Sequence, residues 1–181
     1  MNTNDYSQWF RGSTPYISAH RGKTFVVYLG GEALAHANVT NIIHDLALLH
    51  VLGVQLVLVH GGRPQLDKAL PNSKTHNYRR ITEPSDMDKV TGVYGLLRSH
   101  LEGLFSTGLP NTPLHNVDIS VVSGNFVTAK PLGVLDGIDH LLTGQLRSLD
   151  SARIRDLLSA CLLYTSPSPR DLSTSRMPSS A

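Results

Sequence analysis

Two short apolar runs, each closely followed by a pair of glycines, organise the first third of the chain. The runs are FVVYL at residues 25–29 and VQLVLV at residues 54–59. Because almost every position in them is apolar, they predict strands buried on both faces of a sheet. Between them, apolar residues recur at helical spacing over residues 40–52, and Gly53 stands where a C-terminal helix cap belongs. The pattern therefore predicts a right-handed βαβ unit with parallel strands.

The middle of the chain alternates in the same way, which predicts an α/β fold. Ser85 and Asp88 have the spacing of a capping box, and the helix after them is expected to run to about residue 106. Further elements are expected as an extended piece at 80–82, strands at 116–122 and 125–129, turns at 133–139 and a helix at 150–158.

The first 21 residues differ from the segment after them. Trp9 and Phe10 precede a Gly-Ser-Thr-Pro stretch at 12–15, which Tyr16 follows. Such a break predicts a short helix and a linker ahead of the main domain. We therefore assign residues 1–21 to an N-terminal helix and linker, and residues 22–160 to one domain.

Residues 161–181 differ in composition from everything before them. Serine and proline dominate, and the hydrophobic periodicity disappears. Such a segment buries too little apolar surface to offset its chain entropy, so we expect it to be disordered. A natural disordered tail would have this composition, but the run CLLYTSPSPRD also resembles a translated sequencing adapter. We favour the adapter hypothesis, which predicts that the natural sequence is cut near Ala160.

Composition and charge narrow the classes of function. The formal net charge is +2 and the basic residues are scattered, so the chain has no footprint for nucleic acid or for an acidic membrane surface. No apolar run has the length of a membrane span, and the N-terminus lacks the pattern of a secretory signal. The single cysteine, Cys161, cannot form an internal disulfide. These features predict a cytoplasmic protein without nucleic-acid or membrane partners.

The glycine pairs are the first candidates for ligand binding. Gly30-Gly31 and Gly61-Gly62 would lie at the same carboxyl edge of the sheet, where open α/β folds bind ligands. Their amides could line an anion site, and the guanidinium of Arg63 suits a carboxylate or a phosphate. Glycine pairs are also common in plain turns, and an arginine there could form a surface ion pair, so both interpretations stay open.

Recognisable catalytic and metal-binding patterns are missing from the sequence. The nine histidines do not fall at the spacings of common metal motifs, so no metal site is assigned. A GxSxG serine elbow is absent, and the one cysteine lies in the segment that we exclude, so no catalytic residue is assigned either.

Several separated stretches carry a family resemblance. They are YISAHRGKTFVVYLGGE (16–32), LLHVLGVQLVLVHGGRPQ (48–65), RIT (80–82), VVSGNFVTAKPLGV (121–134) and DGID (136–139). In this order they resemble bacterial N-acetylglutamate synthase, and the resemblance covers residues 6–160. Proteins of this type join an N-terminal amino-acid-kinase-like domain to a C-terminal acetyltransferase domain. The resemblance implies a three-layer sandwich with a mainly parallel central sheet, incomplete here at its C-terminal end.

Two departures from the related kinases bear on the chemistry. The kinases carry a lysine before the first glycine pair, where it contacts the transferred phosphate, and Tyr28 stands at the matching position. A phenol is neutral near pH 7 and cannot replace an ammonium group there. The kinases also continue the second pair with a further glycine, where Arg63 would crowd the path of a phosphoryl group. The resemblance thus implies a vestigial ligand loop made of Gly30, Gly31, Gly61, Gly62 and Arg63.

The resemblance also gives the first residues a role. In arginine-inhibited relatives, an N-terminal helix joins subunits into a ring, and its end helps to form the arginine site. Trp9 and Phe10 are then candidates for the oligomer interface, and Tyr16 is the candidate for the arginine site. Packing of the two aromatic rings onto their own core is the alternative.

Three hypotheses for function follow. In the first, the chain is the front fragment of an N-acetylglutamate synthase, a homo-oligomer that transfers acetyl from the co-substrate acetyl-CoA to L-glutamate, the first step of arginine biosynthesis. L-Arginine is then a regulatory ligand, and the fragment, which lacks the acetyltransferase domain and any cofactor of its own, is inactive. In the second, the chain comes from a small-molecule kinase of the acetylglutamate kinase type. In the third, it is a non-catalytic arginine-sensing module.

Overall fold

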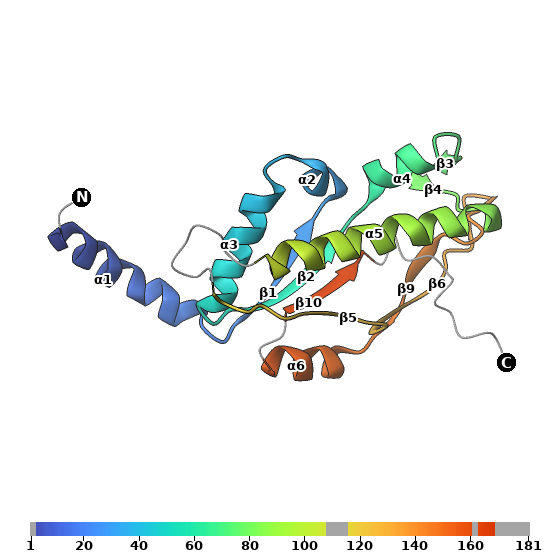
Figure 1. Cartoon of the computed structure of the whole chain (residues 1–181). Coiled ribbons are helices and arrows are strands. Elements are labelled where there is room, and N and C mark those ends of the chain that lie inside the picture. Colours follow the sequence, from blue (N-terminus) through green and yellow to red (C-terminus); the bar gives the residue numbers. More distant parts are fainter. Residues whose placement is uncertain (1–2, 108–115, 161–162, 169–181) are drawn as a thin grey trace.

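A parallel four-stranded sheet forms the centre of the molecule (Figure 1). The computed structural model describes residues 3–107, 116–160 and 163–168. The strand order is β1 (Thr24–Leu29), β2 (Gln55–His60), β10 (Leu163–Pro167) and β5 (Val121–Ser123). Each neighbouring pair runs parallel. The predicted α/β fold with a mainly parallel sheet is confirmed.

Helices cover both faces of this sheet and make the layers of a sandwich (Figure 1). Helices α3 (Val39–Val51) and α5 (Met87–Ser106) pack on one face, and α6 (Ser151–Ser159) packs on the other. The main core lies under α3 and α5, where Leu56, Leu58 and Leu101 are completely buried. A smaller cluster joins Ile154 and Leu158 of α6 to the sheet.

Local sequence explains where these elements begin and end. Gly53 adopts a φ of 95° after α3, a backbone conformation that favours glycine, and the chain then turns into β2. Before α5, a short 3-10 turn η1 (Pro84–Asp86) is closed by a capping box between Glu83 and Asp86. The predicted box of Ser85 and Asp88 was therefore wrong by two residues, because the chain begins to turn at Pro84, ahead of α5.

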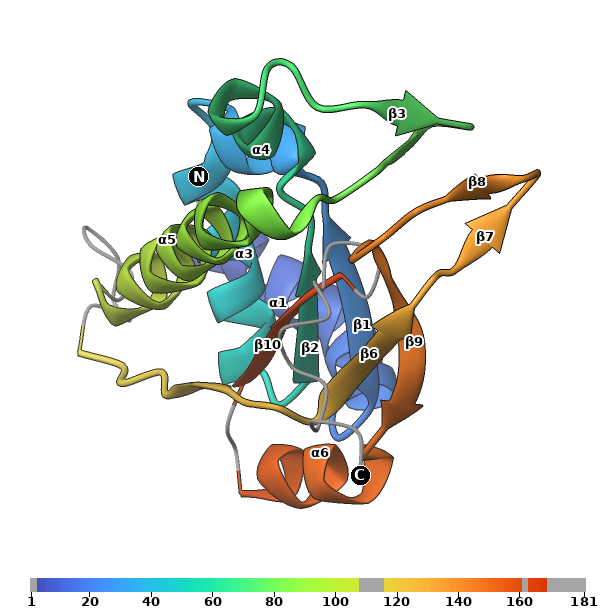
Figure 2. The ribbon, with the colours of Figure 1, turned by 90° about the vertical axis from the view of Figure 1, so that its right-hand side faces the viewer.

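Several short elements escaped the hydrophobic pattern. Helix α2 (Gly31–Ala35) begins at the second glycine of the first pair, and α4 (Arg63–Ala69) directly follows the second pair. Three antiparallel pairs add β3 (Thr75–His76) with β4 (Arg79–Arg80), β6 (Val127–Pro131) with β9 (Gly144–Leu149), and β7 (Val134–Leu135) with β8 (Ile138–Asp139). The β3–β4 and β7–β8 hairpins project on the same side of the molecule (Figure 2). The Asn77 amide joins them by donating to the Asp136 carboxylate at 2.7 Å.

The N-terminal segment is one helix, α1 (Thr3–His20), which projects from the body (Figure 1). A helix was predicted here, but it is longer than expected, because it continues through Pro15, where a linker was expected. A proline removes one backbone donor from a helix. Ser13 and Thr14 donate side-chain hydrogen bonds to the carbonyls of Trp9 and Phe10, each at 3.0 Å, within the turns just before it.

The end of the described chain contradicts the expectation that residues 161–181 are disordered throughout. Leu163–Pro167 form β10, which lies between β2 and β5 in the sheet. Leu163 and Tyr164 are completely or almost completely buried. A strand needs only about five residues, so the average composition of a longer segment does not exclude one. Residues 161–162 and 169–181 lie outside the described residues, and the adapter origin stays a prediction.

Candidate functional site

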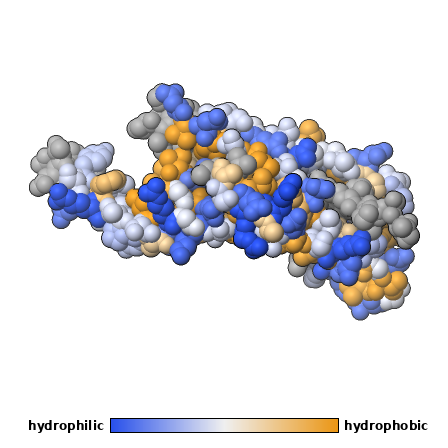
Figure 3. Space-filling view, turned by 90° about the horizontal axis from the view of Figure 1, so that it is seen from below, coloured by the Kyte–Doolittle hydropathy of each residue, from blue (hydrophilic) through white to orange (hydrophobic). Residues whose placement is uncertain are grey.

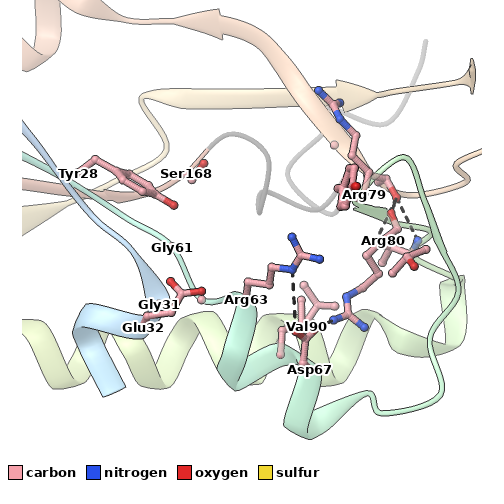
Figure 4. A pocket seen from close by; sticks show the side chains of 17 residues that line it. Tyr28, Gly31, Glu32, Gly61, Arg63, Asp67, Arg79, Arg80, Val90 and Ser168 are labelled. Carbon is pink, nitrogen blue, oxygen red and sulfur yellow. Dashed lines mark hydrogen bonds and ion pairs between the residues drawn. The ribbon is translucent and has the colours of Figure 1, made fainter. Parts of the chain in front are cut away.

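A cavity of about 240 Å³ opens at the carboxyl edge of β1 and β2. Both glycine loops reach it, as the strand pattern predicted, and the β3–β4 hairpin closes its far side (Figure 4). Its lining includes Tyr28, Glu32, Arg63, Asp67, Arg79 and Arg80. The cavity therefore unites residues of β1, α2, α4 and β4, from Tyr28 to Arg80.

The glycine loops pack against each other and against α5. A Cβ atom on Gly31 would meet Pro64 Cδ at 2.6 Å and the Arg63 nitrogen at 3.0 Å. A Cβ atom on Gly62 would meet the side chains of Leu97 and Tyr94 at 2.7 Å. The Gly61 amide donates to the Leu29 carbonyl at 2.8 Å, which ties the second loop to the first. Close approach within the chain is thus one physical reason for glycine at these positions.

Tyr28 lies over the second loop. Its hydroxyl oxygen is 2.7 Å from the position that a Cβ atom on Gly61 would occupy, and its side chain faces the cavity (Figure 4). Tyr28 is nevertheless 63% exposed, because β1 is an edge strand of the sheet. A phenol therefore stands at the strand position that the family resemblance matches to the kinase lysine, and this match stays a prediction.

Arginines give the cavity a positive charge that does not depend on a lysine. Arg80 is nearly buried, and it pairs with Asp67 and donates to Ser73 and the Leu70 carbonyl. Arg63 also forms an ion pair with Asp67, at 3.9 Å between Nε and Oδ2, and its guanidinium points into the cavity (Figure 4). Sequence reasoning proposed Arg63 but missed Arg79, Arg80 and the carboxylate of Glu32. In the sequence, the only signal for Arg79 and Arg80 was that they form an Arg-Arg pair after a two-residue turn. Their place at the cavity depends on the β3–β4 hairpin.

His60 ends β2 immediately before the second glycine pair. Its ring is completely buried, and neither ring nitrogen has a hydrogen-bond partner among the described residues. Burial removes water from the imidazolium and lowers the pKa of His60 to about 4, while the Gly61 backbone acts weakly in the opposite direction. His60 is therefore a neutral side chain of the core at pH 7, next to Tyr94 with ring centroids 6.4 Å apart.

The predicted residues of the N-terminal helix do not line the cavity. Trp9, Phe10 and Tyr16 are 64%, 62% and 71% exposed on α1. Packing of the two aromatic rings onto their own core, the alternative raised from the sequence, does not occur among the described residues. With Tyr6 they form a stripe at helical spacing along α1.

Other exposed apolar surface lies away from α1. In the view from below, apolar surface gathers in the middle of the face and at the end opposite to α1 (Figure 3). Exposed residues of this kind include Val26, Val134, Leu146 and Leu149.

No helix in the described part of the chain is long and apolar enough to cross a membrane. Within the same part, histidine, cysteine, aspartate and glutamate form no group of three or more that could hold a metal ion.

Comparisons with known proteins match most of this chain. The model of the Amino acid kinase family matches residues 23–165. An amino-acid acetyltransferase of Pectobacterium carotovorum is 45% identical over 168 residues, and one of Proteus mirabilis is 50% identical over 149 residues. They cover 88% and 80% of this chain, whereas the chain spans only 37% and 34% of their length.

Solved structures agree with these sequence matches. The N-acetylglutamate synthase of Neisseria gonorrhoeae, complexed with coenzyme A and L-arginine, superposes with a TM-score of 0.78 at 32% identity. The match covers 87% of this chain and 38% of that chain. The same enzyme with coenzyme A and N-acetyl-glutamate gives a TM-score of 0.74 at 33% identity. The family resemblance stated from the motifs is therefore confirmed.

Proposed function

The chain belongs to the amino acid kinase family, and on this premise we propose that it is the front part of an N-acetylglutamate synthase. The complete protein would transfer acetyl from acetyl-CoA to L-glutamate, as the acyltransferase of the first step of arginine biosynthesis in the cytoplasm. The described domain would serve regulation and assembly. Support comes from amino-acid acetyltransferases that match this chain over about a third of their own length.

The observation that carries the proposal is the replacement at Tyr28. Phosphoryl transfer depends on positive groups that stabilise the charge developing on the transferred phosphate. The described cavity has a phenol at the end of β1, and no lysine lines it. Arg63 and Arg80 form ion pairs with Asp67, and Arg79 lies across the cavity from Tyr28 (Figure 4). A kinase function of this site is therefore disfavoured, although the fold is that of the kinases.

A second observation supports a regulatory role. The Neisseria gonorrhoeae enzyme was solved with L-arginine, and Tyr16 lies exposed near the end of α1. We assign Tyr16 to an arginine site that other parts of the complete protein would share. The aromatic stripe of α1 would join subunits into a homo-oligomer, because exposed aromatic rings are common anchors of interfaces. The function of this domain would then be that of an arginine-sensing module within the larger enzyme.

Two assays on the complete protein test the proposal. With acetyl-CoA and L-glutamate, we expect release of coenzyme A that L-arginine inhibits. With ATP and N-acetyl-L-glutamate, we expect no release of ADP from the wild type or from Tyr28→Lys, because one ammonium group does not rebuild the rest of a phosphoryl site. The 181-residue chain should show neither activity. Efficient phosphorylation by any of these proteins would contradict the proposal and favour an acetylglutamate kinase.

The arginine site has its own test in the same assay. Tyr16→Ala should raise the concentration of L-arginine needed for inhibition and leave uninhibited acetyl transfer unchanged. Tyr6→Ala is the matched control, because Tyr6 is also an exposed tyrosine, in the first turns of α1. Equal loss of inhibition in both variants would indicate a general effect of the helix and would remove Tyr16 from the site.

A further inference from the structure

Two histidine rings meet where the β3–β4 hairpin contacts the β7–β8 hairpin (Figure 2). His76 is the last residue of β3, and His140 directly follows β8. Their ring centroids are 5.6 Å apart, with 53° between the ring planes. His140 is completely buried, whereas His76 is half-buried and in contact with solvent. Neither ring lines the cavity at the sheet edge, so the pair forms a separate candidate site.

Each of these rings has a buried nitrogen that the protein leaves without a hydrogen bond. His140 Nδ1 donates to the Ile138 carbonyl at 3.1 Å, since a carbonyl oxygen can only accept. In the neutral ring, Nε2 of His140 therefore carries a lone pair. Nε2 of His140 and Nδ1 of His76 are both buried, and neither has a hydrogen-bond partner among the described residues. Buried polar atoms are normally satisfied, so two such atoms on adjoining rings favour a ligand that both can bind.

From this arrangement we propose that His76 and His140 together bind one divalent transition-metal ion of the type of Zn²⁺. Imidazole nitrogens are preferred ligands of such ions and bind Zn²⁺ at about 2.0–2.1 Å. Two imidazole rings that share one tetrahedral ion have centroids about 5 Å apart, close to the 5.6 Å between these rings. Metal-binding histidines usually donate their other ring nitrogen to a carboxylate or a backbone carbonyl, as His140 does to Ile138.

Two protein ligands make this an open metal site. Within the described residues, no third histidine, cysteine, aspartate or glutamate joins the pair. Structural zinc sites use four protein ligands and catalytic sites use three, so water fills the remaining positions here. Binding should therefore be reversible and weaker than at a structural zinc site. An ion can enter from the side of His76, which is the ring in contact with solvent.

A metal ion at this position ties the two hairpins together. The Asn77 amide and the Asp136 carboxylate already join them by one hydrogen bond, which is exposed to water. A metal bound by His76 and His140 adds a second link between the same hairpins. Because the β3–β4 hairpin closes the far side of the cavity, the ion acts as a clamp on that wall (Figure 4). This inference does not depend on acetyl transfer, and its test measures no turnover.

The first test is isothermal titration calorimetry of the full 181-residue chain with Zn²⁺. His76→Gln and His140→Gln should each weaken binding about tenfold or more, because even the loss of a hydrogen bond to a metal ligand costs about 10–100-fold. His100→Gln is the matched control, because His100 is an exposed histidine of α5, and it should keep the wild-type affinity. Circular dichroism checks the fold of His140→Gln, and if that buried substitution unfolds the chain, the half-buried His76 carries the test.

The decisive variant is His76→Cys, which separates metal binding from a structural role. A thiolate is also a zinc ligand, so His76→Cys should keep the Zn²⁺ binding that His76→Gln loses. With Co²⁺ as the probe, His76→Cys should add a sulfur-to-metal charge-transfer absorption that the wild type lacks. A histidine that only packs between the hairpins would not give this absorption after substitution.

Hydrogen exchange tests the clamp itself. Zn²⁺ should slow exchange in residues 75–80 and 134–139 of the wild type and leave His76→Gln unchanged. The metal site is overturned if Zn²⁺ does not bind at submillimolar concentrations, or if His76→Gln binds it as tightly as the wild type. It is also overturned if His100→Gln weakens binding as much as His76→Gln. Unchanged exchange in both hairpins of the zinc-bound wild type would overturn the clamp.

Discussion

The two regions for which the sequence predicted binding are built in opposite ways. At the sheet edge, glycine loops are packed so closely that added Cβ atoms would lie 2.6–2.7 Å from neighbouring atoms. On α1, four large aromatic side chains are at least 60% exposed. The first region is preorganised by its own chain and presents charged groups in a cavity. The second presents apolar surface with no partner among the described residues.

This difference shows that a motif can have a structural purpose beside a binding purpose. Glycine pairs at the sheet edge allow α2 and α4 to begin directly after the strands and to contact each other. Aromatic rings on a projecting helix contribute nothing to the core, and an exposed apolar stripe of this kind is typical of an interaction surface. Substitutions in the first region should therefore change folding stability, and substitutions in the second should change assembly.

His60 should give the largest effect, through pH. Its pKa is lowered from 6.5 to about 4 because burial excludes water. The unfolded chain thus binds more protons between these values, so stability is fully present above pH 6.5 and is lost as the pH falls towards 4. The loss should reach about 3 kcal/mol, since each pKa unit corresponds to about 1.4 kcal/mol.

Urea unfolding at a series of pH values measures this dependence. His60→Leu should remove the part of the pH dependence that His60 causes and leave the part that carboxylates cause. His100→Gln, at an exposed position of α5, is the control and should keep the wild-type slope. If His60→Leu retained the full dependence on pH between 6.5 and 4, another group would be responsible.

Gly31 should give the next largest effect. In Gly31→Ala the new methyl group would meet Pro64, Gln65 and the backbone nitrogen of Arg63 at 2.6–3.0 Å. Overpacking of this kind costs about 1–3 kcal/mol. Gly92→Ala on α5 is the matched control, because nothing lies within 4 Å of its Cβ position. That variant should be more stable than the wild type by up to about 1 kcal/mol, the difference in helix propensity. Equal effects of both variants in thermal unfolding would refute the close packing of the loops.

Residue patterns predicted the framework of the fold but only part of the site. Apolar runs identified β1 and β2, and helical spacing identified α3 and α5, because burial on one or both faces leaves a regular pattern. Helix α6 was identified by Asp150 as its start. Tyr28 could also be found because it lies in a predicted strand, and the glycine pairs and Arg63 because they come just after one. Arg79 reaches the cavity only through the β3–β4 hairpin, whose two-residue strands are too short to show periodicity.

Two errors show how local chemistry overrides general signals. Pro15 indicated a break, but a projecting helix tolerates it, with side-chain hydrogen bonds from Ser13 and Thr14 to the carbonyls of preceding turns. The serine- and proline-rich composition of residues 161–181 indicated disorder, yet a strand begins at Leu163. The apolar and β-branched residues of LYTSP fit a parallel position between two strands, and a central position buries a strand on both faces. Composition averaged over a segment cannot reveal such a short strand.

Trp9 should give the smallest effect on folding and thereby separates the two regions. Its ring is 64% exposed, so Trp9→Ala should change the free energy of unfolding of the isolated chain by no more than about 0.5 kcal/mol. If α1 joins subunits, the same variant should weaken self-association of the complete protein about tenfold or more, because buried tryptophan anchors dominate interfaces. Sedimentation velocity measures the association, and Leu96→Ala, at a position 73% exposed on α5, is the apolar control.

Unchanged association in Trp9→Ala and Phe10→Ala together would show that the aromatic stripe of α1 is not an interface. A large loss of folding stability in Trp9→Ala would instead show that α1 packs on its own subunit, and the contrast between the two regions would be wrong.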